Sequence, residues 1–409
     1  MLNTYENKPK TVKLNNRRLI LNYMIESGIV TIADIRSDIN LSKTTFTKIM
    51  NYLLEKNLIL EVGKSNSTDE GGRKAVTYHF NSEYAYCIAI HLFPDELYSV
   101  ITDLNSKVLH SKSEYISADI TFEAIISLMA DFVRALMELQ NVSLHQLAGI
   151  AVGSHGLTDY QTGITHYSPH FKNWPKDSSI EGALKKQFPE ITEIFVDNQI
   201  RFQTLAEKNR GCAINKKNVI VIEAGIGLVA GIIVKEQIKR GTHSFAGEIG
   251  HMPLNPESDE CCSCGAKGCF EALVSEKRLH RLAQEMRGTY PNSILFQNHD
   301  EVTIVSILDA AKLNDLLAVQ LIDEVSKWFA IGIINTVLMY DPEIIVIQGA
   351  YSHGGKPFLD AIHNKISQYA PILVNINVTL DLSTLGKDRG TLGGSLHVAQ
   401  RFLEKLSLD

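Results

Sequence analysis

A cluster of cysteines is the feature that most constrains how this chain can fold. Four of its six cysteines lie within nine residues, as Cys261, Cys262, Cys264 and Cys269, and a histidine, glutamates and glycines flank them. The last three have the spacing C-x-C-x4-C. Three thiolates and one imidazole complete a tetrahedral zinc shell, and such a shell would fix the course of a long loop. The alternatives are a set of free thiols or a redox pair.

Charge is divided unevenly along the 409 residues. Residues 1–80 carry 12 Lys and Arg against 8 Asp and Glu, a net charge of +4, although the whole chain carries −6. A basic N-terminal module on an acidic body indicates nucleic acid at one end. The N-terminus has no secretory signal and no run of 18 apolar residues exists, so we expect a cytoplasmic protein without a membrane span. Clustered cysteines there hold metal more often than disulfides.

The first eighty residues have the pattern of a winged helix-turn-helix. One helix is expected around residues 19–24 and ends at Gly28, and a second, short helix is expected at 32–39. Ser42 is placed to cap the start of a third helix. Its apolar residues recur at helical spacing: Phe46, Ile49, Met50, Leu53 and Leu54. Two strands follow at 58–62 and 75–80 and would form the wing.

The polar side of the third helix is the candidate DNA-binding face. Its side chains can donate to phosphates and base edges: Ser42, Lys43, Thr44, Thr45, Thr47 and Lys48. The connection between the two wing strands ends in Arg73 and Lys74, which we expect to meet phosphates or the minor groove. The alternatives are a small helical dimerisation module and ordinary solvated charges on the wing.

From residue 84 onward the pattern is α/β. Strand hairpins are followed by alternating helices and strands, and this order occurs twice. Buried strands are expected at 147–154, 193–198, 219–225 and 343–350, with a long helix at about 315–339. The repetition predicts two related lobes with a cleft between them, which is the usual place for a ligand.

The segments GEIGH, CSCGAKGCFEA and EIIVIQGA, behind a winged helix, resemble the ROK family (repressors, open reading frames and sugar kinases) over nearly the whole chain. The resemblance implies an α/β fold with two ribonuclease-H-like lobes of the actin–hexokinase type. Residues 1–80 would be the winged helix-turn-helix, 81–198 the first lobe, joined by a C-terminal helix at about 389–409, and 199–388 the second lobe. The winged helix points to the repressor branch, which includes the xylose and N-acetylglucosamine repressors.

The resemblance also assigns the metal ligands. The histidine of the family's Gly-Glu-x-Gly-His motif falls on His251, which would join Cys262, Cys264 and Cys269. Four protein ligands leave no open position, so the zinc would be structural rather than hydrolytic. Cys261 stays an alternative to Cys262.

The matching family positions supply the candidate sugar-binding residues: Asn173, Asn198, Gln199, Glu248, His251 and Glu271. For the glutamates the alternative is a salt bridge or a helix cap. Trp174 lies where the family closes the sugar pocket, and its alternative is core packing.

The residues that transfer phosphate in the family are replaced. Gln199 stands where the family has its catalytic Asp, and a carboxamide cannot take a proton at neutral pH. The first phosphate loop falls on residues 91–95, where His91 replaces an Asp, and Phe93 and Pro94 replace glycines. The second loop, residues 225–231, has Ile226 and Val229 in place of Thr and Gly. We therefore expect sugar binding without phosphorylation.

These features predict a sugar-responsive transcriptional regulator and not an enzyme. It would repress carbohydrate-utilisation genes, with xylose as a first guess for the sugar, and would bind operator DNA as a homodimer, with a tetramer left open. One alternative is a ROK sugar kinase with a DNA-binding appendage. Another is a DNA-binding protein that is constitutive or controlled by a partner protein.

Overall fold

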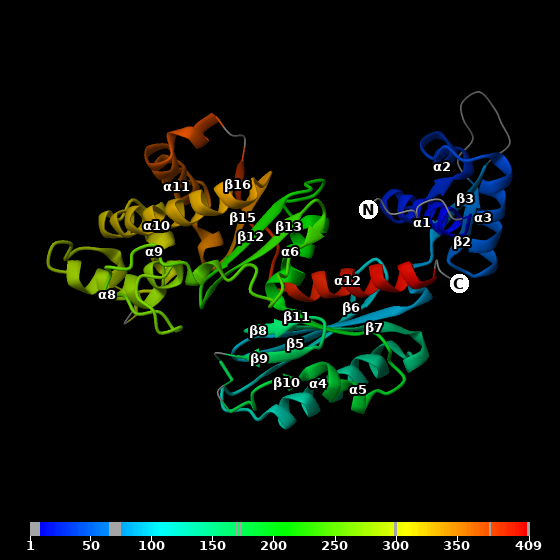
Figure 1. The fold of residues 1–409 in the computed structure, drawn as a ribbon, viewed down its shortest axis with the longest axis horizontal. Coiled ribbons are helices and arrows are strands. Elements are labelled where there is room, and N and C mark those ends of the chain that lie inside the picture. The colour runs from blue at the N-terminus through cyan, green and yellow to red at the C-terminus, as the bar shows by residue number, and fades with distance from the viewer. Residues whose placement is uncertain are drawn as a thin grey trace.

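The computed structural model describes residues 9–64, 75–168, 170–171, 173–297, 301–375 and 378–406. It has an N-terminal head and two α/β lobes (Figure 1), as the sequence predicts. Short 3₁₀ segments connect the larger elements: η1 (Ser82–Tyr84), η2 (Leu144–Gln146), η3 (Ile249–His251), η4 (Ile294–Phe296), η5 (Ala350–Gly354) and η6 (Pro371–Asn375).

The head is a winged helix-turn-helix. Its elements are α1 (Pro9–Ser27), β1 (Val30–Thr31), α2 (Ile32–Asp38), α3 (Lys43–Glu55), β2 (Ile59–Lys64) and β3 (Val76–Phe80). The strands form an antiparallel sheet in the order β1-β3-β2. The apolar stripe of α3 is buried against this sheet and the other two helices, so the helical spacing of Phe46, Ile49, Met50 and Leu53 forms the core of the head. The predicted wing residues Arg73 and Lys74 lie outside the described residues.

The first lobe is built on a five-stranded sheet with the order β11-β7-β4-β5-β6. Its strands are β4 (Tyr86–Leu92), β5 (Glu96–Asp103), β6 (Val108–Tyr115), β7 (Leu147–Ser154) and β11 (Ile194–Asn198). Helices α4 (Phe122–Gln140) and α5 (Ile180–Gln187) cover one face. A small sheet, β10-β9-β8, lies at the edge: β8 (Leu157–Asp159), β9 (Ile164–Tyr167) and β10 (Ser178–Ser179).

The second lobe repeats this topology. Its sheet has the order β14-β13-β12-β15-β16, and in both sheets three antiparallel strands are followed by two parallel ones. The strands are β12 (Val219–Ala224), β13 (Leu228–Val234), β14 (Gln237–Ile238), β15 (Ile344–Gly349) and β16 (Thr379–Leu382). The shared order confirms two lobes of one type, as expected from the repeated pattern.

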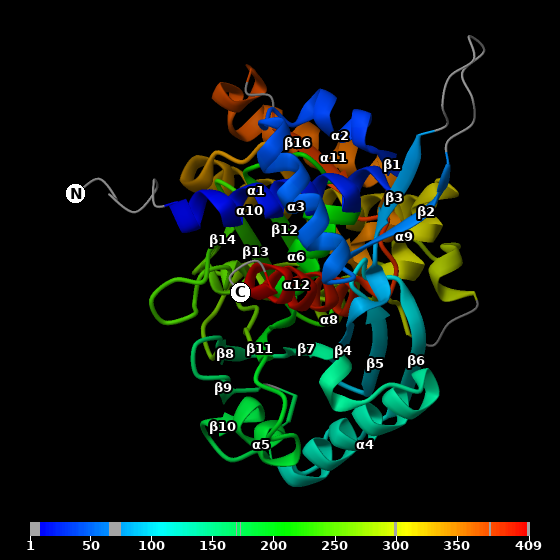
Figure 2. The same cartoon turned by 90° about the vertical axis from the view of Figure 1, so that its right-hand side faces the viewer.

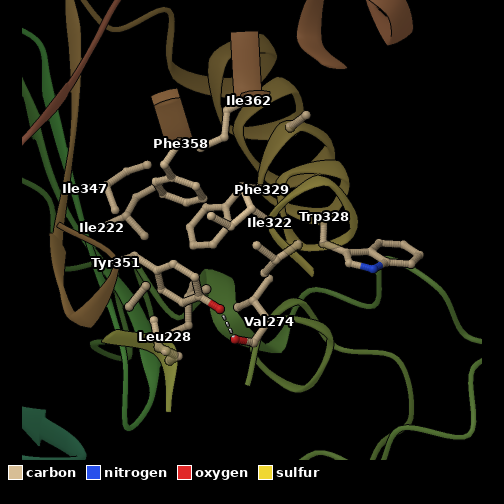
Figure 3. Close-up of a cluster of buried hydrophobic side chains, with 14 of the residues drawn as sticks. Ile222, Leu228, Val274, Ile322, Trp328, Phe329, Ile347, Tyr351, Phe358 and Ile362 are labelled. Carbon is tan, nitrogen blue, oxygen red and sulfur yellow. Dashed lines mark hydrogen bonds between the residues drawn. The ribbon is translucent and has the colours of Figure 1, made fainter. Parts of the chain in front are cut away.

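Helices cover the second sheet and form the largest core. They are α7 (Phe270–Leu273), α8 (Glu276–Met286), α9 (Ile304–Lys312), α10 (Leu316–Tyr340) and α11 (Gly355–Tyr369). Phe329, Tyr351 and Phe358 pack edge-on or stacked at this core (Figure 3). The Tyr351 hydroxyl donates to the carbonyl oxygen of Val274 at 2.5 Å, which satisfies its buried polar atom.

Two helices lie between the lobes. α12 (Arg389–Leu406) packs on β4 and β7 and against α6 (Gln199–Arg210), while α6 also contacts β12 and β13. Figure 1 shows α12 running from the junction of the lobes towards the head. No helix in the described part of the chain is long and apolar enough to cross a membrane.

Candidate functional site

The metal ligands expected from the sequence come together in the structure. The ligand atoms of His251, Cys262, Cys264 and Cys269 all lie within 4.8 Å of one another. Cys262 Sγ is 3.4 Å from His251 Nδ1, and Cys264 Sγ is 3.8 Å from Cys269 Sγ. Zinc–sulfur bonds of about 2.3 Å in a tetrahedron place two sulfurs about 3.8 Å apart. The four side chains therefore fit one tetrahedral metal ion.

The backbone of this loop explains which cysteine joins the cluster. Cys261 forms an isolated antiparallel bridge with Lys267, so this part of the loop is locally extended. The chain turns directly afterwards, where the Gly265 amide donates to the Cys262 carbonyl oxygen at 3.0 Å, and Cys262 and Cys264 on this turn belong to the cluster whereas Cys261 does not. Cys261 is exposed, and its Sγ faces the carbonyl oxygen of Asp259 at 3.7 Å.

Gly268 closes the loop. Its φ is +64°, and an added Cβ would lie 1.7 Å from the carbonyl oxygen of Asn255. The amides of Leu254 and Asn255 both donate to the Gly268 carbonyl oxygen. The loop thus folds back so that Cys269 faces His251.

A cavity of about 380 Å³ lies between the two lobes beside this cluster. Its lining comes from both lobes and includes five of the six candidate sugar-binding residues: Asn198, Gln199, Glu248, His251 and Glu271. Two residues of the His/Cys cluster, His251 and Cys264, therefore form part of the cavity wall.

The sixth candidate, Asn173, is not among the residues that line the cavity, so its role in sugar binding stays a prediction. Its side chain is exposed, and its Nδ2 donates to the carbonyl oxygen of Asp119 at 3.4 Å. The neighbouring Trp174 stacks on Phe171 at 4.7 Å between ring centroids, and its Nε1 donates to the Ile120 carbonyl oxygen at 3.2 Å. Trp174 thus packs, half-buried, against the first-lobe core, while His170 of the same segment lines the cavity.

Asn198 caps the start of α6 at the base of the cavity. Its Oδ1 accepts from the Ile200 amide at 3.1 Å, and its Nδ2 donates to the Gly156 carbonyl oxygen at 2.9 Å. Its amide oxygen and one of its amide hydrogens are thereby engaged in hydrogen bonds to the backbone. The side chain is held in one orientation, which leaves its second amide hydrogen for a ligand.

Glu271 ties the metal loop to the second sheet. Its Oε2 accepts from the Leu228 amide at 2.9 Å, and its Oε1 accepts from the Ser263 hydroxyl at 3.1 Å. Leu228 begins β13 and lies within residues 225–231, the segment that the sequence aligns with the family's second phosphate loop. Glu271 therefore has a structural role as well as a place in the cavity wall.

Glu248 is held in the cavity wall by the sharp turn before η3. An added Cβ on the preceding Gly247, which has a φ of +103°, would lie 1.9 Å from the Ala230 carbonyl oxygen. Only glycine allows the turn to pack this closely on β13. Partial burial raises the pKa of Glu248, while the nearby His251 and Arg201 lower it.

The side of the cavity that corresponds to the family's phosphate loops is lined by side chains in place of glycines and carboxylates. His91 stacks on Phe93 with ring centroids 3.9 Å apart, and its Nε2 donates to Gln199 Oε1. Burial lowers the pKa of His91 to about 4, so the imidazole is neutral at pH 7. Across the cleft, Arg389 forms an ion pair of 3.1 Å with Glu223.

The carboxylate nearest in sequence to Gln199 cannot replace the missing base. Asp197 is buried, and it forms ion pairs with Arg201 and Arg240. Each of its carboxylate oxygens is engaged by one guanidinium group, and Asp197 is not among the residues that line the cavity.

The sequence analysis missed two histidines in the cavity wall, His155 and His170. His155 follows directly after β7, and its Nδ1 lies 3.2 Å from Gln199 Nε2. The His170 ring lies edge-on to the His155 ring, with centroids 5.1 Å apart. The sequence signal that could have found His155 is its place directly after a predicted buried strand, because ligands of α/β sheets bind beyond the carboxyl ends of the strands.

Most of the candidate DNA-binding face of α3 is exposed. Ser42 caps the helix by accepting from the Thr45 amide at 3.2 Å, and Thr45 is half-buried. The other five residues of this face are exposed: Ser42, Lys43, Thr44, Thr47 and Lys48. Figure 1 places α3 on the side of the head away from the lobes. The face is therefore accessible to a large partner.

The head also contacts the end of α12. Arg18 Nη2 donates to the Glu404 carbonyl oxygen at 3.1 Å, and the ring of Tyr84 lies 6.2 Å from that of Phe402. The apolar core of the head continues into residues of α12. Figure 2 shows the head resting over this helix.

Comparison with known proteins agrees with this architecture. The chain matches the ROK family over residues 87–401. It is 27% identical over 396 residues to a xylose repressor of Bacillus spizizenii, covering 96% of this chain and 97% of that protein. It is 28% identical over 401 residues to an N-acetylglucosamine repressor of Escherichia coli, covering 97% and 95%. A glucokinase is also among its relatives.

A solved structure of a ROK family transcriptional regulator, described as a homolog of the E. coli MLC protein, has the same fold. It superposes with a TM-score of 0.81 at 23% identity and covers 97% of this chain and 98% of that one. The match includes the head as well as both lobes. From the sequence match and the shared architecture together, this chain belongs to the ROK family.

Proposed function

We propose that this protein is a sugar-responsive transcriptional repressor that binds a sugar in its cleft without phosphorylating it. One observation carries the proposal most directly. Gln199 and His91 occupy the places of the family's catalytic base and its metal-orienting carboxylate, and they hydrogen-bond to each other. Neither side chain offers a carboxylate for a proton or a magnesium ion.

The sugar-facing wall supports binding without turnover. Glu248, Glu271 and Asn198 offer oxygens and an amide to hydroxyl groups, and a metal-bound His251 would keep its Nε2–H as a donor. The zinc that we propose for the cluster is structural, because all four positions are filled by protein. It would fix the loop that carries these side chains.

The head supports operator binding as the output. The exposed face of α3 and its basic and hydroxyl side chains fit the major groove. We propose that residues 1–80 act as the DNA-binding domain, that 81–198 with about 389–409 and 199–388 act as two lobes, and that a homodimer presents two heads to a two-fold operator.

The two sites are linked by α12. Its first residue, Arg389, lines the cavity and pairs with Glu223, while its far end contacts the head. A helix of 18 residues spans about 27 Å. Movement of the lobes on sugar binding would shift α12 and with it the head, provided that the sugar prefers one lobe arrangement.

Calorimetry combined with an ADP-release assay tests this function. Xylose, N-acetylglucosamine and glucose are titrated into the wild type and into Glu248→Ala, and ADP is followed with ATP present. We expect heat from at least one sugar, loss of that heat in the variant, and no ADP above background. ADP formation that disappears in Glu248→Ala would favour the kinase alternative. No binding of any sugar would favour the constitutive alternative.

A further inference from the structure

The cavity wall contains a buried hydrogen-bonding atom without a partner. His155 Nε2 has no hydrogen-bond partner among the residues that the structure describes, although its Nδ1 is 3.2 Å from Gln199 Nε2. A buried polar atom that stays unpaired destabilises a fold, so its persistence in a ligand cavity calls for a ligand.

The network behind His155 fixes which of its nitrogens carries the proton. Gln199 Oε1 only accepts, so His91 Nε2 donates to it; Gln199 Nε2 only donates, so His155 Nδ1 accepts. Both imidazoles are neutral, since burial lowers the pKa of His91 to about 4 and that of His155 well below its ordinary value. His155 Nε2 then carries a hydrogen.

The reversed orientation of the Gln199 amide is less favourable. It would put the hydrogen of His91 on Nδ1, which is also buried without a partner. This nitrogen faces the backbone of α12, where an added Cβ on Gly390 would lie 2.2 Å from it. An N–H buried against this backbone would have no acceptor, and an unpaired buried donor destabilises the fold more than an unpaired acceptor does. The observed orientation instead places the unpaired donor on His155, a residue that lines the cavity.

We propose that His155 is a specificity-determining residue that donates a hydrogen bond from Nε2 to an oxygen of the sugar effector, with Gln199 and His91 as its positioning residues. This inference rests on the proposed function. In the family's kinases the position of Gln199 holds a carboxylate, which can only accept a hydrogen bond from a ligand hydroxyl. Here the His155 Nε2–H donates, so it recognises a sugar oxygen that accepts a hydrogen bond. Such an oxygen need not bear a hydrogen itself, and a ring or acyl oxygen would fit.

Two variants separate this role from a structural one. In His155→Gln the carboxamide nitrogen reaches roughly the position of the imidazole Nε2 and keeps a donor there. His155→Leu fills similar space and removes the donor. Xylose and N-acetylglucosamine are the probes, and zinc content and melting temperature control for folding.

We expect His155→Leu to weaken binding of the responding sugar about tenfold, as loss of one hydrogen bond implies, and His155→Gln to recover most of the affinity. Long-range ¹⁵N–¹H correlation spectra of histidine-labelled full-length protein should show His155 protonated at Nε2. Wild-type affinity in His155→Leu, or a proton on Nδ1, would overturn the inference. Failure of the wild type to bind either probe would instead remove the proposed function and the effector contact with it.

Discussion

Loss of one metal ligand should release the zinc and loosen the cavity wall. Cys264→Ser replaces a thiolate with a hydroxyl that stays protonated at neutral pH and is a poor zinc ligand. Cys261→Ser is the matched control, because Cys261 is exposed in the same loop, as Cys264 is, and lies outside the cluster. The prediction is about one zinc per chain in the wild type and the control, and almost none in Cys264→Ser.

The expected loss of stability follows from linkage. Zinc at a free concentration of 100 times its Kd stabilises the folded state by about 2.7 kcal/mol. For a lobe of about 190 residues, that free energy corresponds to a shift in melting temperature of about 5–11 °C. Glu271 lies two residues after Cys269, so sugar affinity should fall as well.

Elemental analysis, differential scanning calorimetry and sugar titration of the three proteins provide the test. Retention of zinc by Cys264→Ser with an unchanged melting temperature would refute the assignment. Loss of zinc from Cys261→Ser would show that the wrong cysteine is placed in the cluster.

Three further predictions concern the head, the cleft and acid stability. Substituting alanine for Lys43, Thr44 and Thr45 at the start of α3 should abolish operator binding but leave sugar affinity unchanged, as electrophoretic shift and calorimetry would show. Gln199→Asp should stay without kinase activity in the ADP-release assay, because Phe93, Pro94, Ile226 and Val229 still occupy the phosphate side; turnover would show that one base suffices. Burial lowers the pKa of His397 to about 4, so between pH 6.5 and 4 the unfolded chain binds more protons than the folded chain. As the pH is lowered through this range, the free energy of unfolding therefore decreases, by at most about 3 kcal/mol from this residue. Since His397 packs edge-on against Phe195, His397→Phe should flatten the pH dependence of the melting temperature, and an unchanged slope would remove this residue as a cause.

Local patterns predicted the elements of this fold well. The cap at Ser42 and the apolar spacing of α3 depend on residues within one or two turns, and the structure reproduces both. The repeated hairpin-then-α/β order predicted two lobes of one topology. The cysteine spacing was equally informative, because a tetrahedral metal imposes close approach on its ligands.

Features that depend on the direction of one side chain were harder to predict. Sequence could not decide between Cys261 and Cys262, because that choice depends on where the loop turns, which it does directly after Cys262. Trp174 could have faced either the pocket or the core, and the position of Phe171 determines the outcome. His155 shows no periodicity, and its role emerges only from the distant Gln199 and His91.

The contact between the head and α12 was also beyond sequence patterns. Arg18 and Glu404 are 386 residues apart, and neither position has a local signal for the other. This contact matters for the proposed function, because it connects the head to a helix whose first residue lines the cavity.

The affinity for operator DNA, measured with and without sugar, tests the central claim most directly. DNA sites are first selected from a random-sequence pool with the full-length protein, and fluorescence anisotropy then gives the Kd at fixed salt. Saturation with the sugar that binds the wild type should change this Kd by roughly fivefold or more, as a coupling of at least about 1 kcal/mol requires. The change should be absent in Glu248→Ala. Equal operator affinity with and without bound sugar would contradict the account.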